Sequence, residues 1–336
     1  MIIKNKLRRF YSITCIFFAV FLFFMHSPVS SATDELDFRS FQIWLEGISK
    51  TAKAKGISEK TLNKAFEDIK PIKRVIELDR RQPERTMTLS EYLERVVSED
   101  KLRQGRELYL TYKPLTDSLY EKYKVPGHII IAIWGMETNY GKNMGSYPVI
   151  HSLATLAWEG RRKDFFENEL FIALKILEDG HISFDKMIGS WAGAMGQIQF
   201  MPSSFNRYSV DYNGDGKYDI WNSIEDSLAS AANYLNANGW KDREPWGQEL
   251  ASEGLPEETG LDNRNPLSSY KKRNITGIDG SELRGSPDLS SAIVLPDGKN
   301  GRAFIVHNNF RAILRWNRSV FFGVAVGLMS DHIAAD

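Results

Sequence analysis

The sequence predicts a mainly α-helical protein with a small β-rich insertion near its C-terminal end. Apolar residues recur at steps of three and four from the start of residues 33–124, as at Phe38, Phe41, Leu45 and Ile48. This spacing is typical of the buried face of a helix. The signal weakens over residues 245–301, which are rich in Gly, Asn, Ser and Pro and contain short strand-like runs.

The first 32 residues have the order of a secretory signal peptide: four basic side chains, an apolar run over residues 13–24, and small residues ending at Ala32. We expect cleavage after Ala32 and a periplasmic location. An uncleaved anchor is the alternative, although the run is short for a span of about 20 residues. Cys15 lies inside the run and not at its end, so the sequence does not predict a lipoprotein, and the mature chain has no thiol.

Charge and composition exclude some functions and favour others. Removal of residues 1–32 leaves 39 basic and 43 acidic side chains, a net charge of −4, and nothing indicates binding to nucleic acid. Eight Trp and 12% aromatic residues suit stacking on sugar rings, although most aromatic side chains in any domain belong to the core.

The chain divides by pattern into four mature segments. Residues 33–124 form a helical arm, with one helix running from Leu89 through Val97. Residues 125–244 form a core around the apolar run 128–136. Its further helices are expected at residues 152–159, 164–178, 184–189 and 223–238.

Residues 245–308 form the β insertion, with strands at 291–295 and 303–306 and a hairpin turn at Asp297-Gly298. Residues 309–336 return to the core, with a helix over 310–333.

Other catalytic motifs can be excluded, which leaves acid–base chemistry by a carboxylate side chain. The six histidines are scattered without helical metal-ligand spacing, which argues against a zinc hydrolase. No G-x-S-x-G motif and no phosphate-binding glycine loop occurs.

Glu137 is the only charged residue between His128 and Lys142, and it follows a run of apolar residues. Loss of solvation there raises a carboxyl pKa, and the negative end of a helix that stops nearby acts in the same direction. A carboxylic acid kept neutral can protonate a glycosidic oxygen. The alternative is a buried ion pair with Arg161 or Arg162.

A second candidate region, residues 190–204, combines small residues with Ser190 and Gln199. Small residues let the backbone approach a ligand closely, and the two polar side chains suit sugar hydroxyl or N-acetyl groups. A tight helix contact followed by a helix start at Pro202 explains the same pattern equally well.

A third region, residues 211–219, resembles a calcium loop of the EF-hand type. Asp211, Asn213, Asp215 and the Lys217 backbone carbonyl occupy alternate ligand positions, and a glycine stands at the sixth place. Asn222 stands at the twelfth place, where a glutamate is usual. A polar turn in which a helix-capping box forms at the following helix is the alternative.

Together these runs resemble the lytic murein transglycosylase B family. The similarity spans nearly all of the mature chain. It lies in WGMETNYG (134–141), SWAGAMG (190–196), QFMPSS (199–204), DIWN (219–222), NYL (233–235), GW (239–240), NF (309–310), WN (316–317) and Ser319.

The resemblance implies a lysozyme-like helical core and one catalytic glutamate, which matches Glu137. It implies substrate contacts at Ser190, Gln199, Tyr234 and Asn317. Trp316 and Phe322 stand where tyrosines are usual, so stacking can persist while hydroxyl contacts are lost. It also implies a structural Ca²⁺ or Na⁺ in the 211–226 loop, with Asp226 as the last acidic ligand.

The function implied is lytic transglycosylation of the β-1,4 bond between N-acetylmuramic acid and N-acetylglucosamine in peptidoglycan, which leaves 1,6-anhydromuramic ends. The chemistry needs no cofactor. The expected partners are glycan strands and proteins of wall synthesis or remodelling, and we expect a monomer. A lysozyme-type hydrolase using the same glutamate and a catalytically silent wall-binding protein are the alternatives.

Overall fold

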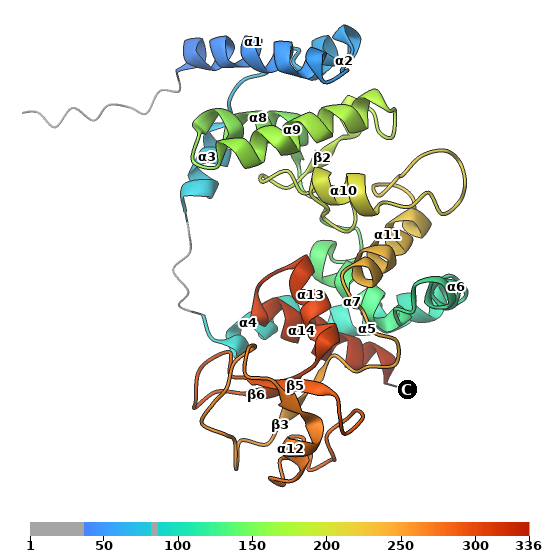
Figure 1. The fold of residues 1–336 in the computed structure, drawn as a ribbon. Helices are drawn as coiled ribbons and strands as arrows, with labels where there is room; N and C mark the ends of the chain where they lie inside the picture. Colours follow the sequence, from blue (N-terminus) through green and yellow to red (C-terminus); the bar gives the residue numbers. More distant parts are fainter. Residues whose placement is uncertain (1–36, 82–86, 336) are drawn as a thin grey trace, which may run out of the picture. The chain divides into compact units, whose positions relative to one another are not determined.

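The computed structural model describes residues 37–81 and 87–335, and the predicted signal peptide lies outside them. From Asp37 onward the chain forms one compact unit (Figure 1). Within the described residues, no helix combines the length and the apolarity needed to cross a bilayer. The division into four mature segments stays a prediction.

The first three helices pack on the helical pair α8 and α9. In α1, four residues on one face are buried, and Trp44 donates a hydrogen bond to Glu167 of α9 at 3.2 Å. Asp37 and Ser58 cap α1 and α2. The elements are α1 (Phe38–Ala54), α2 (Glu59–Ala65), α3 (Lys73–Arg80), α8 (Val149–Glu159) and α9 (Lys163–Glu178).

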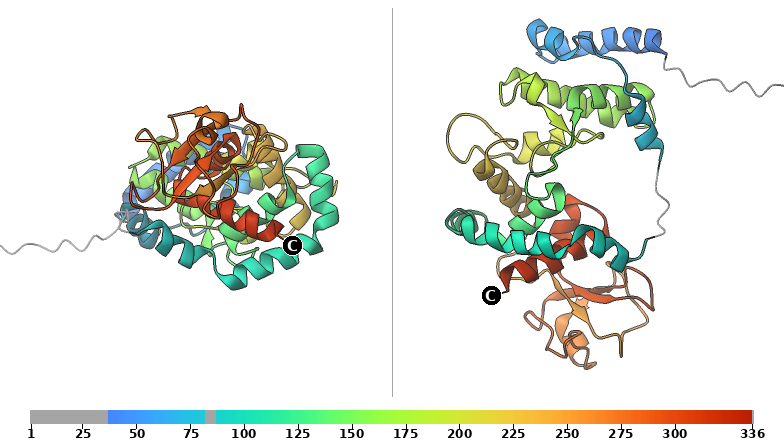
Figure 2. Two further views of the ribbon diagram at one scale, coloured as in Figure 1. Left: turned by 90° about the horizontal axis from the view of Figure 1, so that it is seen from below. Right: turned by 180° about the vertical axis from the view of Figure 1, so that it is seen from behind.

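The next three helices lead to a central helix, α7 (Gly127–Thr138), which is buried along most of its length. The second and third of them pack on α7, and the first packs on the last helix of the chain. They are α4 (Leu89–Val96), α5 (Glu99–Thr111) and α6 (Lys113–Tyr123). The last helix, α14 (Val320–Ala334), packs against both α5 and α7 (Figure 2). A Cβ atom on Gly135 would lie 2.5 Å from Met329 of α14, so the glycine permits this close approach.

The segment after α9 differs from the prediction. The expected helix over residues 184–189 is wrong: a single 3-10 turn (Phe184–Lys186) is followed by β2 (Ile188–Gly189), which pairs antiparallel with β1 (Tyr147–Pro148). The backbone of this segment bonds to β1 and to the following loop instead of to itself, and the close approach there requires a glycine at 189, whose Cβ would otherwise lie 2.1 Å from the Ala194 carbonyl oxygen. Helices α10 (Pro202–Tyr208) and α11 (Ile224–Ala237) follow.

The β insertion is a four-stranded antiparallel sheet in the order β3-β6-β5-β4. Both predicted strands are present, and Ile293 pairs with Ile305 at the centre. Gly298 lies in a turn with φ of +81°, within a loop longer than a two-residue hairpin turn. The elements are β3 (Gly247–Leu250), β4 (Asn265–Pro266), α12 (Leu267–Lys271), β5 (Ser290–Val294) and β6 (Ala303–Val306).

The C-terminal segment is two helices and not the single helix expected over residues 310–333. Helix α13 (Asn308–Trp316) is followed by Asn317, whose backbone is extended, and Ser319 caps α14. The Asn317 side-chain oxygen accepts a hydrogen bond from the Ser319 backbone at 3.0 Å. The break brings the end of α13 beside α7.

Candidate active site

Glu137 lies in the last turn of α7, and the chain turns sharply after it. Asn139, Tyr140 and Gly141 all have positive φ, at 52°, 60° and 80°. The Asn139 N–H bonds back to the Gly135 carbonyl, as in a left-handed helix cap. Glu137 therefore lies at the negative end of the helix dipole, as the sequence predicts.

The carboxyl of Glu137 accepts a hydrogen bond from the indole of Trp316. The Trp316 Nε1 to Glu137 Oε1 distance is 2.8 Å. Burial raises the pKa of Glu137 to about 7, and the hydrogen bond from Trp316 partly opposes this rise. Near neutral pH the group is therefore divided between its acid and its base forms.

The alternative interpretation, a buried ion pair of Glu137, is wrong. Arg161 and Arg162 both bind Asp79, at 3.0 and 2.5 Å. Among residues 37–81 and 87–335, no cationic side chain lies within ion-pair distance of Glu137.

An aromatic cluster holds the Trp316 ring in place. Its ring centroid lies 5.2 Å from that of Phe200 and 4.8 Å from that of Tyr234. The Tyr234 hydroxyl donates to the Arg315 carbonyl at 2.7 Å, and burial raises the pKa of Tyr234 to about 12. Tyr234 is therefore a neutral donor that fixes the end of α13.

The loop with Ser190 and Gln199 is fastened to the same region. The Ser190 hydroxyl accepts from the Ala194 backbone at 3.0 Å. Gln199 has φ of +49°, and its amide donates to the carbonyls of Met144 at 3.1 Å and Gly196 at 2.9 Å. Both side chains are partly exposed, so they remain accessible to a ligand.

Two further residues tie this loop to α7, and the sequence reasoning did not single them out. Gln197 accepts from the Trp134 indole at 3.0 Å, and Thr138 donates to the Gln197 backbone carbonyl at 2.6 Å. The only signal in the sequence was the presence of polar residues inside apolar runs. Through these bonds, the loop is positioned relative to Glu137.

Asn317 and Phe322 differ in accessibility. Asn317 is exposed at the end of α13, whereas Phe322 is only 5% exposed. The neighbouring Phe321 is more accessible, and its ring centroid lies 5.7 Å from that of Tyr92 on α4. Burial and the negative charge of Glu137 raise the pKa of Tyr92, so Tyr92 also belongs to the surroundings of Glu137. A substrate contact by Phe322 stays a prediction.

The predicted cation loop is tightly folded on its own backbone. Asp211 accepts from the N–H groups of Gly214, Asp215 and Gly216. Asn213 accepts from the Asp215 backbone, and Asp215 from that of Lys217.

Asp226 is fully buried and closes this loop. Its carboxylate accepts from the Tyr212 and Asp219 backbones, each at 2.9 Å. Ser223 caps the Asp226 N–H at 3.1 Å, but the carboxylate does not return the bond, so only half of a capping box forms. The oxygen donors suit a hard cation. Among the described residues, however, no three His, Cys, Asp or Glu side chains converge as a metal-binding group.

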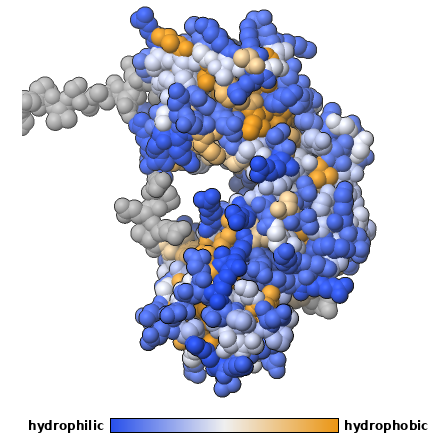
Figure 3. Space-filling view, in the orientation of Figure 1, coloured by the Kyte–Doolittle hydropathy of each residue, from blue (hydrophilic) through white to orange (hydrophobic). Residues whose placement is uncertain are grey.

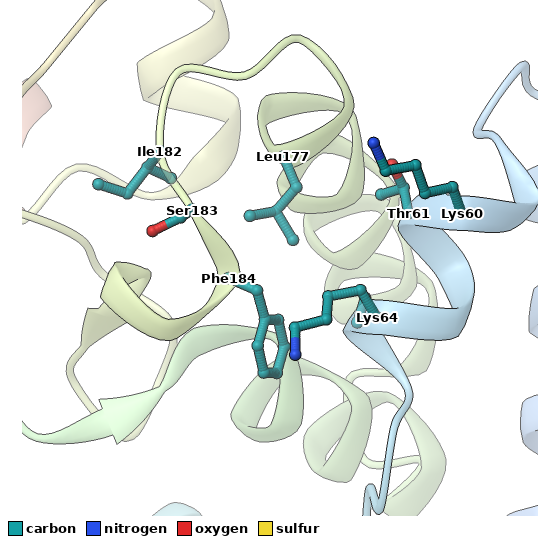
Figure 4. A pocket seen from close by; sticks show the side chains of 8 residues that line it. Lys60, Thr61, Lys64, Leu177, Ile182, Ser183 and Phe184 are labelled. Carbon is teal, nitrogen blue, oxygen red and sulfur yellow. The ribbon is translucent and has the colours of Figure 1, made fainter.

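A separate pocket of about 150 Å³ lies between α2 and the turn after α9 (Figure 4). Lys60 and Lys64 extend from α2, and Lys64 lies beside Phe184. Lys64 already pairs with Glu67 at 3.1 Å. The pocket shares no residue with the surroundings of Glu137.

The visible face in Figure 3 is mostly hydrophilic, with apolar residues in separate small groups. The large exposed apolar residues also belong to different elements, such as Ile43 of α1, Leu110 of α5 and Phe165 of α9. Single exposed apolar residues of this kind are ordinary.

Comparison with known proteins decides the family. The transglycosylase SLT domain matches residues 40–331. The chain belongs to the transglycosylase SLT family. The predicted resemblance to lytic murein transglycosylase B is confirmed, since the membrane-bound lytic murein transglycosylase B of Escherichia coli is 31% identical over 245 residues. That alignment covers 72% of this chain and 66% of the relative, just under two thirds of its length.

Solved structures of SLT-type transglycosylases have the same fold. SltB3 from Pseudomonas aeruginosa, in complex with NAG-anhNAM-pentapeptide, is 43% identical with a TM-score of 0.83, covering 87% of this chain and 79% of its own. The Escherichia coli transglycosylase Slt35, in complex with calcium, is 27% identical with a TM-score of 0.74, covering 90% and 94%. The predicted mainly α, lysozyme-like fold is confirmed.

Proposed function

We propose that this SLT family member is a lytic transglycosylase that cleaves peptidoglycan glycan strands, with Glu137 acting first as acid and then as base. The observation that carries the proposal is the setting of Glu137: a half-buried carboxyl with a pKa of about 7 that accepts the Trp316 indole N–H. A group with this pKa can donate and accept a proton at neutral pH.

In the first step, Glu137 protonates the oxygen that links N-acetylmuramic acid to N-acetylglucosamine. The indole is only a donor, so Oε1 is occupied as an acceptor and Oε2 is left to carry the proton. As the C–O bond breaks, positive charge develops on the sugar. The N-acetyl oxygen of the substrate stabilises this charge, so no second carboxylate has to act as nucleophile.

In the second step, the ionised Glu137 takes the proton from the muramic 6-hydroxyl, whose oxygen bonds to the anomeric carbon and closes the 1,6-anhydro ring. Glu137 is thereby protonated again and ready for the next cycle. The hydroxyl belongs to the same sugar, so it attacks at a high effective concentration. The relative SltB3 has been solved with a fragment that contains an anhydro sugar, which supports this product.

Ser190, Gln199 and Asn317 are the proposed polar contacts to the glycan, because their polar side chains are partly or fully exposed in this region. Trp316 contacts Glu137 directly, and Tyr234 holds Trp316 in place. A hydrolase with the same acid would use water in the second step. A catalytically silent wall-binding protein would bind the glycan strand without cleaving it.

Outside the chemistry, we expect export to the periplasm, action as a monomer, and contact with wall-synthesis or remodelling proteins. A structural Ca²⁺ or Na⁺ would be held by Asp211, Asn213, Asp215, the Lys217 carbonyl and Asp226. A divalent cation would supply charge neutralisation to this acidic loop. The calcium complex of Slt35 supports this assignment.

A gel assay with purified murein tests activity. The wild type is expected to clear the gel, and Glu137→Gln is expected to leave it opaque. Glu46→Gln, an exposed carboxylate on α1, is the matched control and should clear the gel as the wild type does. Clearing by Glu137→Gln would overturn the role of Glu137, and no clearing by the wild type would favour a silent binding protein.

A further inference from the structure

The short helix α4 owes little of its position to its own packing. Of its eight side chains only Leu89 is fully buried, and the helix packs on α14. A helix of this length is marginal in water without tertiary contacts. Its place in the fold therefore depends on the contacts that hold its ends and on the one face that it buries.

The β insertion holds the N-terminal end of α4. Asp297 lies in the loop between β5 and β6, and both of its carboxylate oxygens accept from the Leu89 backbone N–H, at 2.9 and 3.0 Å. The two residues are 208 positions apart in the sequence. The carboxylate also faces the positive end of the helix dipole, which favours the contact further.

Asp297 pairs a donor that α4 cannot pair by itself. Thr88 and Glu91 form a capping box, in which the side chain of each accepts from the backbone N–H of the other. The N–H of Leu89 has no partner within the helix, because it belongs to the first turn. Leu89 is buried, so loss of its hydrogen bond would leave a costly unpaired donor.

The loop that carries Asp297 is itself closely folded. The Gly298 N–H donates to the Leu295 carbonyl at 3.0 Å, and the Gly301 N–H donates to the Gly298 carbonyl at 3.1 Å. A Cβ on Gly301 would lie 2.6 Å from the Cβ of Asp297, so the glycine lets the loop fold against that side chain. A fixed turn of the β insertion therefore presents Asp297 to α4.

The contact at Leu89 lies one helical turn from Tyr92. The two residues are three positions apart and share one face of α4, and the Tyr92 N–H donates to the Thr88 carbonyl at 3.0 Å. Tyr92 is half-buried and packs against Phe321. Burial raises the pKa of Tyr92, and the negative charge of Glu137 raises it further, so Tyr92 lies near that carboxyl. A movement of the start of α4 would change the position of Tyr92 relative to Glu137.

We propose that Asp297 is a positioning residue of the active site, which anchors α4 and thereby keeps Tyr92 beside the carboxyl of Glu137. The inference rests on the proposed function, since it names a further residue that the same site requires. The Tyr92 ring limits the access of water to the carboxyl from the side of α4. Asp297 acts only through α4 and needs no contact with the glycan.

The pKa of Glu137 gives a test that requires no turnover. The carboxyl carbon of Glu137 is followed by NMR in glutamate-labelled protein and is assigned by its absence from Glu137→Gln. Asp297→Ala should lower this pKa by about half a unit or more, because a displaced Tyr92 admits water to the carboxyl. Asp297→Asn keeps an acceptor oxygen and should have a pKa near that of the wild type. An unchanged pKa in Asp297→Ala would overturn the proposal.

Asp37→Ala is the matched control for the loss of a helix cap. Asp37 is an exposed aspartate that accepts from the Ser40 backbone at 3.0 Å and caps α1, a helix that bonds to α9 through Trp44. The variant removes a capping carboxylate as Asp297→Ala does, but the pKa of Glu137 should stay at the wild-type value. An equal shift in Asp37→Ala would contradict a specific role for Asp297.

A double-mutant cycle separates positioning from a general effect on the fold. The kcat/KM for glycan oligomers is measured in the wild type and in Tyr92→Ala, each with and without Asp297→Ala. The substitution should lower kcat/KM about three- to tenfold in the wild type and less than about twofold in Tyr92→Ala, where the residue through which it acts is gone. Equal falls in the two backgrounds would contradict the proposal. A wild type that cleaves no glycan contradicts the proposed function instead, and the NMR titration still decides the role of Asp297.

Discussion

Single residues set the chemistry through the surroundings of one carboxyl. Glu137 is held at the end of α7, where burial disfavours its charge, while the Trp316 indole favours it. The opposition of these two effects places the pKa near 7, between the values suited to a pure acid and a pure base. Two substitutions test these effects, one that removes the titrating carboxyl of Glu137 and one that removes the indole donor of Trp316.

Glu137→Gln should abolish activity and stabilise the fold at high pH. The folded pKa is raised above 4.5, so the wild type loses stability as the pH rises from about 4.5 to about 7 and levels off above that. Glutamine removes this loss and can still accept the indole N–H. At pH 8 the variant should be more stable by about 3 kcal/mol, and at pH 4 the two should agree, in thermal or urea unfolding. A variant less stable than the wild type at pH 8 would contradict the raised pKa of Glu137.

Trp316→Phe should move the basic limb of the pH profile of kcat/KM upward. The indole bond lowers the pKa of Glu137, so its loss lets that pKa rise. The value of kcat should fall about tenfold, because the carboxyl loses its orientation. Trp316→Tyr restores a donor and should recover part of both effects.

Trp44→Phe is the control for this pair, because the Trp44 indole also bonds a carboxylate, Glu167, in another part of the molecule. The pH profile of Trp44→Phe should match that of the wild type. A basic limb that does not move in Trp316→Phe would show that Trp316 has no influence on the acid.

At the level of elements, tight loops bring Ser190 and Gln199 to the region of α7. Gly145 has φ of +93°, and a Cβ there would lie 2.1 Å from the Gly189 carbonyl oxygen. The preceding Met144 carbonyl accepts the Gln199 amide. The two loops can approach this closely only because residue 145 is a glycine. Adding one methyl group at Gly145 tests this.

Gly145→Ala should destabilise the fold and lower kcat/KM. Gly160→Ala is the matched control, because Gly160 has a similar φ of +94° but its nearest neighbouring atom would lie 3.8 Å from the added Cβ. The control substitution should lower the free energy of unfolding by about 1 kcal/mol, because of the positive φ alone. Gly145→Ala should lower the free energy of unfolding by about 2 kcal/mol more than the control, measured by urea unfolding. Equal losses of stability in the two variants would contradict the close contact.

The 211–226 loop gives the second prediction at this scale. If it holds a cation, Ca²⁺ should raise the melting temperature of the wild type and a chelator should lower it. Asp226→Asn should reduce this response, since it removes the buried carboxylate that closes the loop. Asp100→Asn, an exposed residue of α5, should respond as the wild type does. A melting temperature unmoved by Ca²⁺ would argue against the site.

At the level of the whole molecule, the sequence predicted best what depends on local pattern. The apolar run before Glu137 was enough to place α7 and the catalytic candidate. The break after Trp316 could not be predicted, because the apolar spacing continues through it without Pro or Gly.

Tyr92 was missed for another reason. Tyr92 meets Phe321 only through packing of α4 on α14. Contacts between residues so distant along the chain leave no trace in a single sequence.

Analysis of the products by mass spectrometry in H₂¹⁸O tests the central claim most directly. If Glu137 directs the muramic 6-hydroxyl onto the anomeric carbon, the new ends are 1,6-anhydromuramic residues. These are one water lighter than reducing ends and contain no ¹⁸O. Reducing ends labelled with ¹⁸O would contradict lytic transglycosylation and identify a hydrolase that uses the same acid.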